Sequence, residues 1–308
     1  MEFGPHLMLA VLEGLVQASV LTLTALGLSL VFGVMRVVNV AHGEFFMLGA
    51  VLAWWITSLL GGGAGLAFAA ALVGAPLMVG AIAALADWLV LRRVAYDPER
   101  TIVATIGLLY IFQQITLMTF GPDARPVPPP FNTRLALPWF EWGEGGIALY
   151  WPWGLSITSY KLFVIAAAPV VLVALWLVMT RTRLGLVLRA TRIDSETARA
   201  FAIPVEQVYA LVFGIGAALA ALGAVLVVPI RQAHYLMGAD PLLLSFIVVI
   251  IGGLGSLRGT VLAAVLIGMS DGIISVFFTP TLAKIFATLV VAMVLVARPG
   301  GLFGERRT

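Results

Sequence analysis

Long apolar runs, separated by short charged or glycine-rich segments, fill most of this sequence. A helix needs about 20 apolar residues to cross the hydrocarbon of a bilayer. The runs are continuous rather than alternating, which indicates helices and argues against a β-barrel. We therefore predict an all-α bundle with eight to nine spanning segments, depending on whether one short run crosses. The runs, one of them interrupted only by Asp271, cover residues 14–35, 45–60, 66–86, 101–122, 162–180, 207–230, 241–257 (the short run), 259–283 and 285–297.

Composition excludes several classes of protein. Of the 308 residues, 61% are hydrophobic and 11% are charged, whereas a soluble domain has about 45–50% apolar and about 25% charged residues. The absence of Cys excludes disulfides, thiolate metal sites and cysteine nucleophiles. The first residues carry no Lys or Arg, and the run after Glu13 is longer than a signal-peptide core. We therefore expect a first spanning helix there rather than a cleaved leader.

Basic residues fall unevenly on the two sides that nine spans would define. With the N-terminus outside, 13 of the 18 basic residues lie on the inner side, where Lys and Arg collect in membrane proteins. This pattern predicts an external N-terminus and a cytoplasmic C-terminus. The 13 are Arg36, Arg92, Arg93, Arg100, Arg181, Arg183, Arg189, Arg192, Arg199, Arg258, Arg298, Arg306 and Arg307.

The longest connection, residues 121–159, is rich in proline and tryptophan. It holds seven of the 16 Pro and four of the eight Trp. Proline stiffens the backbone, and tryptophan favours the membrane–water interface. We predict an external loop, and the pattern leaves open whether it is a docking surface or a cap that lies on the bilayer.

A first polar interruption holds Asn39, His42, Gly43 and Glu44. Ionisable groups inside spanning segments are costly and usually mark a pathway or a structural pair. The pattern predicts a broken helix that is buried in protein or lines a water-filled cavity. Asn39 is a candidate cap for the next helix, and Glu44 would lie in its first turn. All four are candidate pathway or gate residues; the alternative is a tight inner-face turn with an ordinary cap.

A second interruption holds Gly252, Gly253, Gly255 and Ser256, and Arg258 follows. Because glycine permits unusual dihedrals and close backbone approach, these four residues predict another helix break along the pathway. The alternative is ordinary packing of helices through small residues. The segment is not a phosphate loop, since the chain has no GxxxxGK[ST] pattern.

Residues 181–204 have the composition of a soluble segment, with dense charge of both signs. They predict a short amphipathic helix on the cytoplasmic side, with Ser195 or Asp194 as its N-cap and a stop at Ile203 before a proline. The charge fits docking to a protein; the alternative is a helix held by anionic lipid. The candidate docking residues are Arg189, Arg192, Asp194, Glu196, Thr197, Arg199 and Phe201.

One face of this predicted helix carries apolar residues. Ala198, Phe201 and Ala202 are spaced at i, i+3 and i+4, so they would share a face.

Nothing in the chain has the pattern of a catalytic, metal or cofactor site. There are three His, and no HExxH, GxSxG or paired-carboxylate pattern occurs. We therefore expect no enzyme activity, no metal, no cofactor and no nucleic-acid partner. Glu13, Asp87 and Asp271 are isolated acids near or within spans; we interpret them as structural, with a proton relay as the alternative.

Five blocks of sequence, in order from end to end, resemble the inner-membrane permeases of branched-chain amino-acid ABC importers, the LivH-like kind. They are NVAHGEFFMLGA (39–50), TIGLLYIFQQ (105–114), RTRLGLVLRATRIDSETARAFAIP (181–204), GGLGSLRGT (252–260) and VLVARPGGLFGE (294–305). The first and last are the more specific, since related sugar permeases carry a similar Gly-rich block.

The resemblance implies one permease domain over residues 1–308, a polytopic inner-membrane helical bundle in a bacterial cell membrane. It implies four kinds of partner: a second homologous permease subunit, identical or different; two cytoplasmic ATPase subunits; a periplasmic substrate-binding protein; and the lipid bilayer. By position, residues 189–203 match the coupling helix that inserts into the ATPase. Where the family often has Leu-Gly-Ile, this chain has Phe201-Ala202-Ile203, which puts the expected glycine turn in doubt.

The resemblance implies transport of branched-chain, aliphatic amino acids, driven by the partner ATPases. The family also includes permeases for urea, short amides and other small polar solutes, so these stay as alternatives. From the residues alone, an ion-coupled carrier or channel is an alternative of a different class, because the isolated acids permit it.

Overall fold

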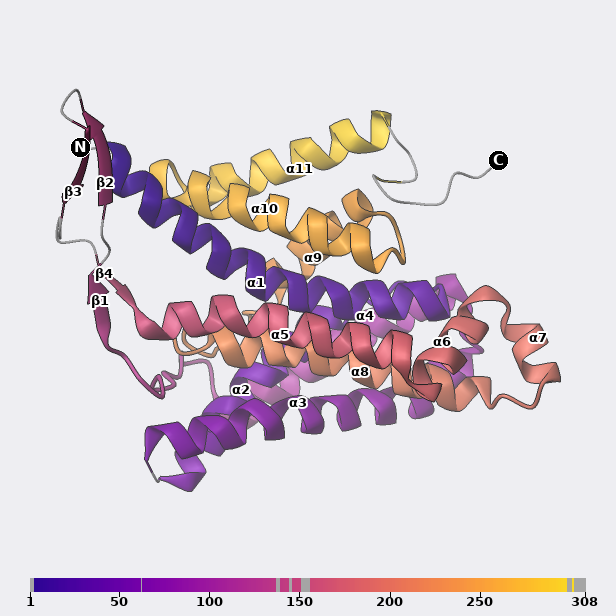
Figure 1. Cartoon of the computed structure of the whole chain (residues 1–308). Helices are drawn as coiled ribbons and strands as arrows, with labels where there is room; N and C mark the ends of the chain where they lie inside the picture. Colours follow the sequence, from indigo (N-terminus) through magenta and orange to yellow (C-terminus); the bar gives the residue numbers. More distant parts are fainter. Residues whose placement is uncertain are drawn as a thin grey trace.

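The computed structural model describes residues 3–61, 63–136, 139–143, 146–150, 156–297 and 301. Within this part of the chain, seven helices are long and apolar enough to cross a membrane, and two shorter apolar helices accompany them. They lie side by side in one bundle (Figure 1), so the prediction of a polytopic helical bundle is confirmed. The long helices are α1 (Phe3–Met35), α2 (His42–Leu60), α3 (Ala64–Leu89), α4 (Pro98–Phe120), α5 (Ser159–Arg181), α8 (Val205–Val227) and α10 (Leu257–Phe277); the short ones are α9 (Ala239–Gly252) and α11 (Pro280–Ala297).

The glycine-rich and proline positions mark helix ends better than the charges do. α2 ends in a left-handed residue, Gly61, at φ +48°. Near the C-terminus, the apolar run 259–283 was expected to form one spanning segment that stops before Lys284. The helix there, α10, ends earlier, at Phe277, and α11 already begins at Pro280. Lys284 is accommodated in α11 because its ammonium donates to Asp240, 2.7 Å away, and proline is well suited to the first turn of a helix.

α1 forms the centre of the bundle, since 89% of its most apolar 18-residue stretch is buried. It packs along α10, α8, α5 and α9. The contact with α10 is close because small residues face one another: Gly268 lies against Ala18, and Gly272 lies against Gly14. A hydrogen bond between the Ser29 and Thr260 hydroxyls, 2.9 Å long, also joins the two helices.

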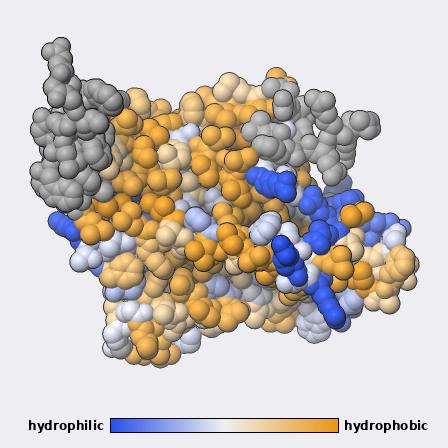
Figure 2. Space-filling view, in the orientation of Figure 1, coloured by the Kyte–Doolittle hydropathy of each residue, from blue (hydrophilic) through white to orange (hydrophobic). Residues whose placement is uncertain are grey.

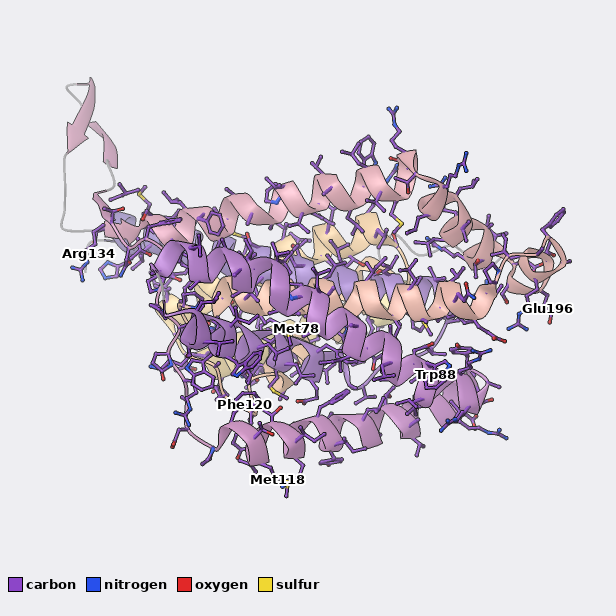
Figure 3. The ribbon with its side chains drawn as sticks, turned by 90° about the horizontal axis from the view of Figure 1, so that it is seen from below. Met78, Trp88, Met118, Phe120, Arg134 and Glu196 are labelled. Carbon is purple, nitrogen blue, oxygen red and sulfur yellow. The ribbon has the colours of Figure 1, made fainter. Side chains whose placement is uncertain are left out.

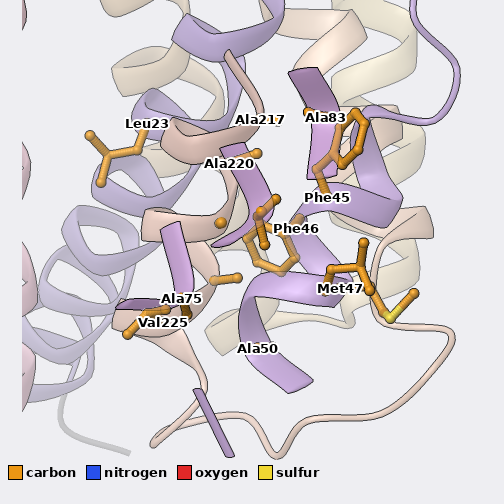
Figure 4. Packing of buried hydrophobic residues seen from close by; sticks show 14 of the residues in the cluster. Leu23, Phe45, Phe46, Met47, Ala50, Ala75, Ala83, Ala217, Ala220 and Val225 are labelled. Carbon is orange, nitrogen blue, oxygen red and sulfur yellow. The ribbon is translucent and has the colours of Figure 1, made fainter. Parts of the chain in front are cut away.

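A second core forms where α2, α3 and α8 all pack against one another. Figure 4 shows bulky side chains of α2, such as Phe45 and Phe46, against alanines of the neighbouring helices, such as Ala75 and Ala220. The α2–α8 crossing is tight at Gly49, where an added Cβ would lie 2.5 Å from the Ala221 Cα atom.

The proline- and tryptophan-rich connection forms two small antiparallel strand pairs, a hairpin and a pair that encloses it along the chain, which the sequence did not predict. In one, β1 (Arg134–Ala136) pairs antiparallel with β4 (Ser156–Thr158); in the other, β2 (Trp139–Gly143) pairs with β3 (Gly146–Tyr150). Two of the four tryptophans, Trp151 and Trp153, lie outside the described residues.

The bundle has two chemically different ends. At one end lie the β2–β3 hairpin, the β1–β4 pair and the start of α1; at the other, α6 (Arg183–Ile193) and α7 (Ser195–Ala200) project beyond the bundle (Figure 1). Arg134 and Glu196 mark the two ends in Figure 3. Figure 2 shows hydrophilic residues gathered over the α6–α7 end.

Ion pairs and hydrogen bonds show which connections share an end. At the hairpin end, Glu13 pairs with Lys161, and Arg125 bridges to Ala233 through the backbone. At the α6–α7 end, the Arg36 guanidinium donates to the Arg192 carbonyl. There the 3-10 helix η1 (Leu91–Val94) also reaches α8, because Arg92 pairs with Glu206 at 2.5 Å.

Most of the basic residues predicted to lie inside are therefore at the α6–α7 end. Of the 13 predicted residues, three, Arg298, Arg306 and Arg307, lie outside the described residues.

Candidate functional site

The first polar interruption forms a break deep inside the bundle. α1 ends at Met35, residues 36–41 return alongside it without helical structure, and α2 begins at His42. The His42 Nε2 atom lies 2.8 Å from the carbonyl oxygen of Thr24, which is about three helical turns back from the end of α1. α2 therefore starts about 16 Å below the helix end, and its N-terminus points into the bundle rather than at the membrane surface.

Local hydrogen bonds make this non-helical backbone tolerable. The Asn39 Oδ1 atom accepts from the Ala41 N–H at 3.0 Å, and the Val40 N–H donates to the Thr105 hydroxyl at 3.2 Å. Asn39 thus caps the backbone just before α2, although Ala41 and not Asn39 occupies the N-cap position. Because residues 37–41 are buried or half-buried in protein, they meet the condition under which a membrane protein accepts irregular backbone.

His42 and Glu44 are both almost fully buried, with 0% and 2% of their surface exposed. A carbonyl only accepts, so the His42 Nε2 atom donates to Thr24. Glu44 lies in the first turn of α2, as predicted, and its Oε1 atom accepts from the Gln113 side-chain amide at 2.9 Å. Within the described residues, the His42 Nδ1 and Glu44 Oε2 atoms have no hydrogen-bond partner. Two buried polar atoms are thus available for a further ligand or water.

A small cleft lies on the outer side of Gln113. Its volume is about 290 Å³, and its lining includes Tyr110, Gln113, Gln114 and Tyr235. The first three of these residues are on α4, whose apolar stretch is only 22% buried, and Tyr235 lies between α8 and α9. Gln113 is the residue that connects this cleft with the buried carboxylate of Glu44.

Gly43 completes this cluster by permitting close contact. The Gly43 and Gly238 backbones touch, and an added Cβ on Gly43 would lie 2.8 Å from the Leu242 Cβ atom. The start of α9 is thereby held against the start of α2. The first four predicted residues therefore form one assembly with α1, α4 and α9.

The second interruption lies at the α6–α7 end, not beside the first. Gly252 ends α9, Gly253 has φ +97° and Gly255 has φ +79°. Ser256 is the N-cap of α10, and its hydroxyl accepts from the Gly259 N–H at 3.2 Å. The break predicted here is present.

Gly255 is the contact point of this break with α1. An added Cβ on it would lie 2.8 Å from the Gly33 Cα atom and 3.8 Å from the Arg192 guanidinium. The second interruption thus adjoins the predicted docking segment, while the first adjoins Thr24 and Gly27, which precede Gly33 in α1 and lie deeper in the bundle. The structure does not bring the two interruptions into a single site.

The predicted docking helix corresponds to α7, and a second helix that was not predicted, α6, precedes it. Asp194 separates α6 from α7, and it is the N-cap of α7: its carboxylate accepts from the Glu196 and Thr197 N–H groups at 2.9 and 3.1 Å. The Thr197 hydroxyl donates to it as well. Hydrogen bonds from Thr197, first from its side chain and then from its backbone, hold the pKa of Asp194 below its ordinary value. Of the two cap candidates, Asp194 is therefore the one observed.

The end of this helix departs from the prediction. α7 stops at Ala200 rather than Ile203, because Ala202 has a left-handed backbone at φ +60°. The Ile203 N–H donates to the Ala198 carbonyl at 3.1 Å, and the Ala202 N–H donates to the Arg199 carbonyl at 2.9 Å. These two bonds form a Schellman ending with Ala202 in the position that glycine usually takes.

The predicted shared face is therefore wrong. Ala198 is buried, whereas Phe201 is 78% exposed, because the chain has left the helix before Ala202. The glycine turn expected from the resemblance is nevertheless made, with alanine in it.

Three residues of the first site were not predicted: Thr24, Thr105 and Gln113. A signal was present for Gln113, since the adjacent amides Gln113 and Gln114 interrupt an uncharged run and polar groups within spans are used for interhelical hydrogen bonds. Thr24 acts through its carbonyl, which no sequence pattern reveals.

Comparison with known proteins gives consistent matches over nearly the whole chain. The model of a family described as "branched-chain amino acid transport system / permease component" matches residues 10–297. The high-affinity branched-chain amino acid transport system permease protein BraD of Pseudomonas aeruginosa is 27% identical, covering 97% of this chain and 96% of the relative. The corresponding permease protein LivH of Escherichia coli is 26% identical, covering 95% and 94%. A probable branched-chain amino acid transport permease protein LivH of Methanocaldococcus jannaschii is 25% identical, covering 96% and 92%. No solved structure matches the chain.

Proposed function

We propose a transport function from one premise: the chain belongs to the family of branched-chain amino acid transport system permease components. It is thus a transmembrane permease subunit of the ABC class, without a catalytic role. We propose further that it carries branched-chain, aliphatic amino acids that a periplasmic binding protein delivers, and that two separate ATPase subunits drive the cycle. The names of its relatives support this choice of substrate.

The observation that carries the coupling proposal is the projecting α6–α7 segment. It extends beyond the bundle (Figure 1), and Glu196 and Arg199 are exposed on it. The cap at Asp194 and the Schellman ending at Ala202 fix its shape at both ends. A short, rigid and charged helix of this kind is suited to insertion into a groove of the ATPase subunit, at a cytoplasmic α6–α7 end.

The break at the start of α2 supports the pathway proposal. Its helix N-terminus, deep in the bundle, favours the carboxylate of an amino acid, and the Glu44 carboxylate favours the ammonium group. The cleft at Gln113 opens on α4, a poorly buried helix. Amide and phenol groups are costly against lipid, so we propose that a second permease covers this face and forms the other wall of the pathway.

Charge reversal tests the coupling segment. In proteoliposomes that contain the assembled transporter, Glu196→Lys and Arg199→Glu should each lower ATPase stimulation by loaded binding protein at least about tenfold, because each turns an attraction at the interface into a repulsion. Arg100→Glu, at the same end but outside the segment, is the matched control and should keep stimulation. Unchanged stimulation and uptake in both segment variants would refute the docking role.

A separate measurement tests the pathway and the substrate. Glu44→Gln removes the charge while keeping the size, so uptake of leucine should fall about tenfold while ATP hydrolysis continues. Glu99→Gln, in the exposed first turn of α4, is the control. Uptake of urea in place of leucine would contradict the proposed substrate, and leucine uptake without any ATPase subunit would contradict the ABC mechanism in favour of an ion-coupled carrier.

A further inference from the structure

A second cleft lies where four helices end on the α6–α7 side. Its volume is about 210 Å³, and it is bounded by the last turns of α1 and α5, by α6, and by the first turn of α10. The floor includes Leu30, Val34 and Leu188, which are at most 5% exposed. The cleft is therefore an apolar hollow at the depth where spanning helices meet the surface of a membrane.

Exposed arginines surround this apolar floor. Arg189, Arg192 and Arg258 line the cleft from two different elements, α6 and α10. None of the three forms an ion pair with any described residue. Within the described part of the chain, the one hydrogen bond of their guanidinium groups runs from Arg189 to the Met179 carbonyl. The cleft surface is almost entirely apolar, so the three arginines line it mainly with their aliphatic stems. Among the described residues, no carboxylate pairs with any of these three cationic groups.

The surroundings of the cleft point to lipid rather than water. Trp176, on the wall, is 54% exposed, and tryptophan favours the interfacial level of a bilayer. On α6, Leu186 and Ile193 are 61% and 78% exposed, which suits a helix that lies along the membrane surface.

We propose that this cleft binds one anionic phospholipid, such as phosphatidylglycerol. An acyl chain would cover the floor at Leu30, Val34 and Leu188, and the phosphate would accept hydrogen bonds from the three arginines. Basic pockets between spanning helices on the cytoplasmic side bind anionic headgroups in this way. A carboxylate of a protein partner would satisfy the arginines but would leave the apolar floor uncovered, and a zwitterionic lipid would cover the floor without neutralising the charge.

The position of the cleft gives the lipid a mechanical role. Arg192 is on α6, beside the Gly255 break that precedes α10, and the Arg192 carbonyl also holds Arg36 at the end of α1. A headgroup bound to Arg192 and Arg258 together would fasten α6 to α10. This role does not depend on which solute the permease carries. It assigns Arg189 and Arg192 of α6 to lipid, and it leaves α7, with Glu196 and Arg199, for the proposed contact with the ATPase.

Native mass spectrometry of the purified full chain in detergent tests the proposal. The wild-type chain should retain one phosphatidylglycerol in preference to phosphatidylcholine. Arg189→Gln, Arg192→Gln and Arg258→Gln should each weaken that affinity about fivefold, the typical contribution of one basic residue near an anionic surface. Arg100→Gln, an exposed arginine at the same end outside the cleft, should leave it unchanged. These four side chains are exposed, and a thermal melt verifies that each variant is folded.

Two further measurements separate the sources of a bound anion. Trp176→Ala should weaken retention of phosphatidylglycerol, because it removes a wall that contacts the acyl chain. Inorganic phosphate at millimolar concentration should fail to displace the lipid. Equal retention by the cleft variants and the control would overturn the proposal, and so would full displacement by phosphate. Arginine variants that retain lipid but lose ATPase binding would assign these side chains to the protein partner instead.

Discussion

Replacing Gly49 by alanine should weaken the α2–α8 crossing that positions the buried polar cluster. An added Cβ would lie 2.5 Å from the Ala221 Cα atom and 2.8 Å from its carbonyl oxygen, whereas carbon atoms make their best contact at about 3.5–4.0 Å. The atoms met are backbone atoms and the Cβ of Ala221, none of which can rotate away, so the helices must separate by about 1 Å. Overpacking of this kind costs about 1–3 kcal/mol, and the better helix propensity of alanine returns about 0.5–1 kcal/mol.

The expected net loss for Gly49→Ala is about 1–2 kcal/mol, or a melting temperature lower by about 2–8 °C. Circular dichroism of the purified chain in detergent measures it. Gly107→Ala is the matched control: it is also within a helix, α4, but apart from its own helix backbone no atom of a described residue lies within 4 Å of its added Cβ. It should melt at the wild-type temperature or up to about 4 °C higher. If both variants shift together, or if Gly49→Ala is the more stable, the packing argument is wrong.

Three further predictions concern single contacts. Ala202→Gly should raise stability by about 1 kcal/mol, because the left-handed backbone costs a non-glycine residue about 1–2 kcal/mol, whereas Ala200→Gly within α7 should lower it by about 0.5–1 kcal/mol; thermal melts compare the two. Asp194 has a depressed pKa in the folded chain. Its stabilisation of α7 is therefore fully present above its ordinary pKa of 3.8 and is lost as the pH falls through the lower pKa of the folded state. Hydrogen exchange of the first α7 amides should accelerate only in that acidic range in the wild-type chain, and at every pH in Asp194→Ala. Thr260→Val should cost about 0.6 kcal/mol by removing the hydrogen bond to Ser29, and a double-mutant cycle with Ser29→Ala should recover that coupling.

Hydropathy located the spanning helices but not their depth in the bundle. α1 has a mean hydropathy of 2.0 and is 89% buried, whereas α5 has a mean hydropathy of 2.8 and is 17% buried. Because lipid and protein core are both apolar, a helix that faces either one has the same composition. Enclosure of α1 therefore required the structure.

Local chemistry was predicted where a residue acts on its own neighbours. The cap at Asp194 and the place of Glu44 in a first turn both follow from spacing along the chain. The partners Thr24 and Gln113 lie 18 and 69 residues from His42 and Glu44, and only the packing of whole helices brings them together. The early end of α7 was missed because a left-handed alanine is strained, and the sequence alone favours a continued helix.

The central place of α1 has a consequence for biosynthesis. Ser29 leaves the ribosome first, and its partner Thr260 follows 231 residues later. At about 5–20 residues per second, translation of that interval takes about 10–50 s. For that time the first helix presents a packing surface of glycine and hydroxyl groups before its partner helix, α10, has been synthesised. An insertase or another chaperone that covers this surface of α1 during synthesis would protect the unfinished polypeptide from contacts with the wrong helices.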